Sequence, residues 1–168
     1  MRMDRARRLL LTASPSALAI VLVLLASLPW GVPQFSMLCP MVGLIAVYYW
    51  TVHLPDFMPP AGAFAVGLVT DLIIGGPLGL NAFVLTLAQA VALMNRRALA
   101  GESFLLVWLG FAAITALAGA ALWIGASLFW AALLSPRALL AQLAVTVAVY
   151  PLAAQFFALA QRRLLARG

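Results

Sequence analysis

Long apolar segments with almost no charged residues dominate this chain and constrain its fold more than any other feature. Six such segments, each about as long as a bilayer-spanning helix, are separated by short stretches that hold proline, glycine and charged residues. Among the 168 residues, 66% are hydrophobic and only 8% are charged, whereas soluble domains contain about 45–50% apolar and about 25% charged residues. So few charges cannot cover so much apolar surface in water. The composition excludes a soluble enzyme, a disordered protein and a disulfide scaffold, and it indicates an integral membrane protein.

We predict an all-α polytopic membrane protein with about six transmembrane helices in one bundle. A span needs about 20 residues at a rise of about 1.5 Å each. The expected spans are 16–33, 37–53, 60–76, 78–95, 103–134 and 137–159, within a transmembrane domain of residues 16–160. A basic N-terminus (1–15) and a basic tail (161–168) flank this domain. The fifth span is long enough to tilt or to leave the membrane, and Pro151 should kink the sixth.

The basic residues predict the orientation of the spans. All ten are arginines that lie in short clusters between apolar segments. If both termini are cytoplasmic, nine arginines fall on the cytoplasmic side and only Arg137 falls outside, as the positive-inside rule requires. Aromatic residues near the ends of spans fit an interfacial belt: Trp30, Tyr48, Tyr49, Trp50, Trp123 and Trp130. The arginines do not alternate with aromatic residues in a patch, so no nucleic-acid partner is expected.

The N-terminal segment also has the basic start and apolar core of a signal peptide. A second apolar segment follows it almost at once, so we favour an uncleaved first helix. Cys39 is the only cysteine and is interpreted as an ordinary core residue.

Asp71 is the only acidic residue expected inside the membrane, where a charge is costly and therefore marks a candidate site. On a helix, Ala63, Gly67, Asp71 and Gly75 share one face, and such small residues let a neighbouring helix approach closely. Three interpretations of Asp71 remain open. The carboxylate could cap the next helix, which begins just after Gly75-Gly76-Pro77; it could bind a substrate or ion; or it could relay protons.

The stretch from Gly75 to Gly79 predicts a tight outer turn, because Pro77 cannot continue a helix and glycines tolerate positive φ. It is no phosphate loop, since no lysine follows it. Asn81 and Gln89 lie eight residues apart on the following helix and should form interhelical hydrogen bonds on one face.

Two short cytoplasmic segments are candidate contact sites. The proline-rich loop with Pro55, Asp56 and Phe57 should be stiff and extended, with an exposed Phe-Met pair that docks a partner or dips into the headgroups. Arg96 and Arg97 form the basic part of the second loop. The chain has no Ser/His/Asp set, no paired carboxylates and no cluster of metal ligands beside His53, so we expect no enzyme activity, no cofactor and no metal.

Several segments together resemble the MreD family of rod shape-determining proteins. The resemblance extends over nearly the whole chain and is carried by residues 48 to 111: Tyr48-Tyr49-Trp50, then Pro55, Asp56 and Pro59, then Gly67-Leu68-Val69-Thr70-Asp71-Leu72, then Gly75-Gly76-Pro77-Leu78-Gly79-Leu80-Asn81-Ala82, then Arg96-Arg97, and finally Ser103 to Phe111.

The resemblance implies a non-enzymatic scaffold of the cell-elongation machinery in the bacterial inner membrane. It implies the partners MreC, the MreB filament, RodA and the elongation transpeptidase, reached directly or indirectly, besides membrane lipids. It also implies a fold similar to the S-component of energy-coupling-factor transporters. In the scaffold hypothesis, the stripe of small residues docks a partner helix, and substitution of Gly67 or Gly75 by leucine blocks that contact. The alternative is a small-molecule-binding S-component-like subunit, with an outward-facing pocket that Asp71 and Asn81 could line and with Gln89 deeper.

Overall fold

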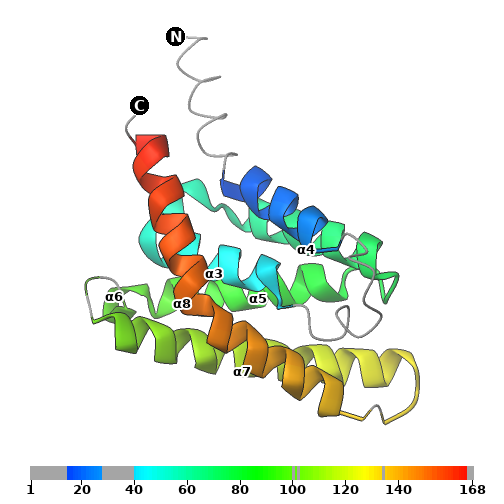
Figure 1. The fold of residues 1–168 in the computed structure, drawn as a ribbon. Helices are drawn as coiled ribbons and strands as arrows, with labels where there is room; N and C mark the ends of the chain where they lie inside the picture. Colours follow the sequence, from blue (N-terminus) through cyan, green and yellow to red (C-terminus); the bar gives the residue numbers. More distant parts are fainter. Residues whose placement is uncertain (1–14, 28–39, 100, 102, 134, 166–168) are drawn as a thin grey trace.

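The computed structural model describes residues 15–27, 40–99, 101, 103–133 and 135–165. For residues 163–165 it describes the backbone only. All regular structure in these residues is helical (Figure 1). The helices are an N-terminal helix (Pro15–Ala26), α3 (Val42–His53), the 3₁₀ turn η1 (Pro55–Phe57), α4 (Pro60–Ile74), α5 (Leu80–Met94), α6 (Arg96–Leu99), α7 (Phe104–Phe129) and α8 (Arg137–Leu165).

Each of the six expected spans coincides with one apolar helix, which confirms the all-α class. By length and composition, α7 and α8 are long enough to cross a bilayer, whereas the other four apolar helices have 10–17 residues. The helix α8 runs to Leu165, beyond the expected end at residue 159, and α7 stops at Phe129, short of residue 134. The predictions for the N-terminal arginines, Trp30, Cys39 and the side chain of Arg163 lie outside the described residues.

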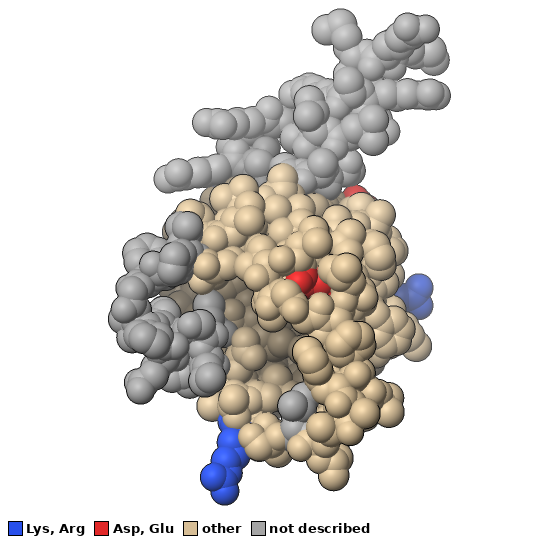
Figure 2. All heavy atoms as spheres, turned by 90° about the vertical axis from the view of Figure 1, so that its right-hand side faces the viewer, with Lys and Arg blue, Asp and Glu red and all other residues tan. Residues whose placement is uncertain are grey.

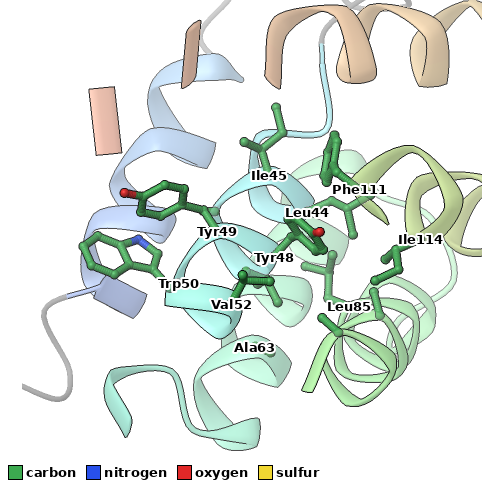
Figure 3. Close-up of a cluster of buried hydrophobic side chains, with 14 of the residues drawn as sticks. Leu44, Ile45, Tyr48, Tyr49, Trp50, Val52, Ala63, Leu85, Phe111 and Ile114 are labelled. Atoms are coloured by element: carbon green, nitrogen blue, oxygen red, sulfur yellow. The ribbon is translucent and has the colours of Figure 1, made fainter. Parts of the chain in front are cut away.

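The short helix α3 is the centre of the molecule. Ten consecutive residues, from Gly43 to Val52, are buried. A helix that is apolar on all sides belongs either in a protein core or in a bilayer. In this structure, other helices bury α3. It packs against α4, α5 and α8 and provides much of the core shown in Figure 3.

The interfacial belt expected at the end of this span is therefore wrong for three residues. Tyr48, Tyr49 and Trp50 are at most 3% exposed and lie in the core. The Tyr48 ring contacts Phe111 of α7, and the Tyr49 ring stacks on Phe157 of α8, so the two tyrosines point to different sides of α3 (Figure 3). Aromatic side chains at the end of an apolar segment mark an interface only if that helix faces lipid. In contrast, Trp130 is 61% exposed after the end of α7, as expected for such a belt.

The helices α7 and α8 form an antiparallel pair beside this core, and α8 changes direction about half-way along its length (Figure 1). Pro151 is the middle residue of α8, where the sequence predicts a kink. Because proline has no N–H, the carbonyl four residues earlier, at Val147, loses its helical donor. The Trp108 indole of α7 supplies the missing hydrogen bond, with 2.9 Å between its Nε1 and the Val147 carbonyl oxygen.

We expect Trp108→Phe to lower the free energy of unfolding by about 1 kcal/mol, because it removes the donor of this part-buried hydrogen bond. Pro151→Ala returns a backbone N–H that can donate to the Val147 carbonyl. In the Pro151→Ala background, Trp108→Phe should therefore lower the free energy of unfolding clearly less than it does in the wild type. Melting temperatures of the detergent-solubilised single and double variants measure the difference. Equal losses in the two backgrounds would contradict this pairing.

The outer surface of the bundle is apolar. Large exposed side chains include Leu72, Leu78, Leu105, Leu109, Leu128 and Leu152. Figure 2 shows that charged side chains are few on the face it presents. An apolar surface of this extent is expected where lipid replaces water as the solvent.

Candidate functional site

The buried carboxylate of Asp71 is the most distinctive polar feature of the described bundle. Asp71 lies near the end of α4 and is 1% exposed. Its Oδ2 accepts hydrogen bonds from the backbone N–H of Gly79 (2.9 Å) and Ala82 (3.2 Å). Its Oδ1 accepts from the backbone N–H of Asn81 (3.0 Å) and from the Asn81 side-chain amide (2.9 Å). Four donors thus converge on one carboxylate.

Three of these donors are backbone groups at the start of α5. The first N–H groups of a helix have no partner within it, and the helix dipole favours an anion there. No side chain of the helix's own N-cap residue, Gly79, fills this role. Asp71 fills it from the preceding helix, so the hydrogen bonds match the capping interpretation. The expected interhelical hydrogen bond of Asn81 is made to this same carboxylate.

Gly67 allows the close approach of the two helices. A methyl group added to Gly67 would lie 2.4 Å from Cα and 2.6 Å from N of Ala82 in α5. Ala63, one turn earlier, is fully buried. Two residues of the stripe on α4, Gly67 and Asp71, therefore contact the start of α5 of the same chain. The sequence predicted that a helix of a partner protein packs on this stripe. In the structure, α5 of the same chain lies there, because the tight turn folds α5 directly back along α4.

The other glycines of the turn have a different role from Gly67. Gly75 ends α4 with φ of 71°, and Gly79 precedes α5 with φ of 93°, both in the left-handed region that favours glycine. No atom lies within 4 Å of a methyl group added at Gly75 or Gly76. Among the described residues, no helix of this chain approaches Gly75, and its constraint within the chain is the backbone conformation. The expectation that leucine there blocks a partner helix stays a prediction.

The proline-rich loop after α3 also differs from expectation. Pro55, Asp56 and Phe57 form the 3₁₀ turn η1 instead of an extended segment. Met58 is 2% exposed, so the Phe-Met pair is not an exposed docking element. The Met58 carbonyl accepts a hydrogen bond from the Gln89 side-chain amide of α5, which ties the loop to the bundle. Sequence spacing placed Gln89 on the same face as Asn81 and predicted an interhelical hydrogen bond, whereas the observed partner lies in the loop.

The two arginines after α5 are separated by the fold. Arg97 is exposed, whereas Arg96 is partly buried and its Nε lies 3.3 Å from the carbonyl oxygen of Val52. Val52 belongs to the last turn of α3, where carbonyl groups lack helical partners and favour a cation. Arg96 thus caps the C-terminal end of α3 by donating to one of its last carbonyl groups. Asp56 and Arg97 are exposed on the surface.

The polar groups of the site are used within the fold. The hypothesis of a small-molecule-binding subunit places Asp71 and Asn81 at a pocket. In the structure, these two side chains are hydrogen-bonded to each other. In the described part of the chain, no group of three or more His, Cys, Asp or Glu residues could hold a metal ion. Ala82 completes the site and was not singled out by sequence reasoning, because its contribution is a backbone N–H and close contact with Gly67. A small residue one position after Asn81 was the only available signal.

Fold and site together define an all-helical protein with several apolar helices, in which Asp71, the one buried carboxylate among the described residues, joins two helices of the same chain. The sequence model of the family described as rod shape-determining protein MreD matches residues 3–161. The chain therefore belongs to the MreD family of shape-determining membrane proteins.

Comparison with a curated relative agrees with this assignment. The chain is 32% identical over 76 residues to the rod shape-determining protein MreD of Haemophilus influenzae. That alignment covers 45% of this chain and 46% of the relative, so the chain matches about half of the relative's length. No solved structure matches the chain, and the expected likeness to an S-component gains no support.

Proposed function

We propose that this protein is a non-enzymatic scaffold of the cell-elongation complex in the bacterial inner membrane, with both termini in the cytoplasm. In this role it supports MreC and, directly or through MreC, the MreB filament, RodA and the elongation transpeptidase. The observation that carries the proposal is the family match over residues 3–161. The use of Asp71 for internal hydrogen bonds agrees with a packing role and not a catalytic one.

We do not place the docking surface for a partner helix on the small-residue stripe of α4, because α5 of the same chain contacts this stripe. The outward faces of α7 and α8 are the better candidates, because only 33% and 22% of their most apolar segments are buried. The exposed Asp56 and Arg97 remain candidates for contacts with cytoplasmic partners.

Depletion of the protein from its rod-shaped host tests this proposal. We expect the cells to become round and MreC to lose its normal distribution, with both restored by the wild-type chain. Cell shape and the position of a fluorescent MreC fusion are the measurements. Rod-shaped cells with MreC in place after complete depletion would contradict the scaffold role.

A small-molecule-binding subunit remains the alternative function, but no observation favours it. Its pocket would need free polar groups, and the Asp71 carboxylate already accepts four hydrogen bonds. Ligand screens that follow the melting temperature of the purified protein separate the two functions. Tight binding of a small solute would support the alternative.

A further inference from the structure

We propose that the distal half of α8, residues 152–165, lies flat in the membrane interface, where headgroups meet acyl chains, and does not cross the bilayer. Its partner is the phospholipid layer: apolar side chains insert among the upper acyl chains, and Arg162 binds phosphate groups. The membrane-crossing part of α8 then ends at Pro151 and not at residue 159. This arrangement does not depend on the protein partners proposed above.

The first half of α8 runs along α7 and comes close to the beginning of that helix at Tyr150. Leu143 packs against Gly119, beyond the middle of α7. The Tyr150 ring stacks on Phe111 at 4.3 Å and lies 6.4 Å from the ring of Phe104, the first residue of α7. Only seven residues of α7, about 10 Å, separate Phe111 from Phe104. Because 15 residues of α8 follow Tyr150, about 22 Å of helix, a straight α8 would project beyond the start of α7.

Beyond Tyr150, α8 passes across α3 and not along it. The Tyr150 ring lies 5.8 Å from the ring of Tyr48. Phe157 then stacks on Tyr49 at 5.3 Å, and the Tyr49 hydroxyl donates to the Gln161 side chain at 3.1 Å. From Tyr150 to Gln161, α8 rises about 16 Å, yet its contacts on α3 advance by one residue, from one side of that helix to the other. Figure 1 shows the same course, since α3, α5 and α7 run in similar directions and the distal half runs across them.

The crossing lies next to a charged end of the bundle. Tyr49 precedes His53, the exposed last residue of α3, by one helical turn of about 6 Å. Arg96 binds the Val52 carbonyl at this end, and Arg97 is exposed beside it. Arginine side chains near helix ends extend into the headgroup region. The distal half is therefore about one turn below a charged surface, and amphipathic helices lie about 5–10 Å into the boundary of headgroups and acyl chains.

The surface of the distal half that faces away from the bundle is amphipathic. Leu152, Phe156 and Leu159 form an apolar strip and are 68%, 51% and 61% exposed. Gln155 and Arg162 are also exposed, and their spacing of seven residues puts them together on one flank of this strip. An apolar strip beside a basic, polar one is typical of a helix that lies in the interface. A helix surrounded by acyl chains would expose both polar side chains to hydrocarbon, which is costly.

A phospholipid layer offers both kinds of contact along one helix. Upper acyl chains suit the apolar strip, and phosphate groups suit the basic flank. The guanidinium of arginine is planar and binds a phosphate group through two parallel hydrogen bonds. The sequence places Arg163 directly after Arg162, so two basic residues follow the strip.

Depth-dependent fluorescence quenching tests this arrangement. Cys39→Ser removes the only cysteine, and a thiol-reactive fluorophore is attached at Leu152→Cys or Leu159→Cys, which lie seven residues and about 10 Å apart. Ala138→Cys and Ala144→Cys, both exposed and about 9 Å apart in the first half of α8, form the matched control pair. The purified full chain is reconstituted into phosphatidylcholine vesicles that carry nitroxides in both leaflets, either near the headgroups or deep in the acyl chains. Each fluorophore then reports its depth in either orientation of the protein.

We expect the ratio of deep to shallow quenching to differ by less than about two-fold between residues 152 and 159, with shallow nitroxides the stronger quenchers at both. In the control pair, the ratio should rise by more than about two-fold from residue 138 to residue 144, because that half crosses the bilayer. Phe156→Cys replaces either reporter that fails to insert. A larger difference between residues 152 and 159, or stronger quenching by deep nitroxides at both, would overturn the proposal.

Replacing Arg162 and Arg163 together with leucine tests the contact with phosphate groups. The fluorophore at residue 159 should then move deeper, with a rise of at least about 1.5-fold in the same ratio, because the basic flank no longer holds the helix at the headgroups. Gln155→Leu, which leaves both arginines in place, is the control and should change the ratio less. An unchanged ratio in the double variant would overturn the role given to phosphate binding.

Discussion

Replacing Asp71 with alanine should remove most of the folded protein from the membrane. The change leaves four donors without an acceptor, and a buried donor without a partner costs about 1–3 kcal/mol. Even if water reaches some of them, we expect a loss of at least about 3 kcal/mol. The amount of monodisperse protein after mild detergent extraction, measured with a C-terminal fluorescent tag, should fall several-fold.

Asp71→Asn separates shape from hydrogen bonding. The asparagine amide keeps one acceptor oxygen but turns an NH₂ group toward donors, so we expect a loss between those of the wild type and Asp71→Ala. Asp71→Asn would keep most of the side-chain volume that packs at this position. A wild-type yield and melting temperature for Asp71→Ala would contradict the capping role, and equal losses in both variants would show that hydrogen bonding to the second oxygen is decisive.

Gly67→Ala should be nearly as damaging, although it adds only one methyl group. That methyl group would lie 2.4 Å from the Ala82 Cα atom, and backbone cannot move aside as a flexible side chain can. Overpacking of this kind typically costs about 1–3 kcal/mol. Separation of α4 from α5 would also lengthen the hydrogen bonds of Asp71, so we expect a loss at the upper end of this range or beyond.

Gly76→Ala is the matched control for this substitution. It adds the same group in the same hairpin, at a residue with nothing within 4 Å of the new methyl and without a positive φ. Its melting temperature should stay within a few degrees of the wild-type value. Similar melting temperatures for the Gly67→Ala and Gly76→Ala proteins would refute the idea that close contact at Gly67 holds the hairpin together.

The helices and the identity of the key residue were predictable from local patterns. Apolar runs bounded by Gly, Pro and charge define the six helices, and the spacing of Asp71 before Gly75-Gly76-Pro77 indicates a carboxylate near the start of the next helix. Both are properties of neighbouring residues, for which sequence spacing is sufficient evidence. The orientation of the whole bundle in the membrane stays a prediction from the arginines.

The neighbours of each helix were not predictable in the same way. A stripe such as Ala63, Gly67 and Asp71 looks identical whether it packs against the same chain or a partner. Tyr48 and Trp50 end an apolar segment whether that helix faces lipid or lies in the centre. Pro151 indicates a free carbonyl at Val147, but its donor, Trp108, lies 39 residues away along the chain. These features depend on tertiary packing, which single-sequence patterns do not encode.

We expect Asp71 to serve the fold of the proposed scaffold and to take no part in a reaction. The most direct test compares cell shape with the amount of membrane-inserted protein in depleted cells that express the wild-type chain or its Asp71→Asn, Asp71→Ala, Gly67→Ala or Gly76→Ala variant over a range of levels. We predict that all five proteins follow one relation between amount and cell length-to-width ratio. An Asp71→Asn protein that is folded and present at the wild-type level, but leaves the cells round, would contradict the claim.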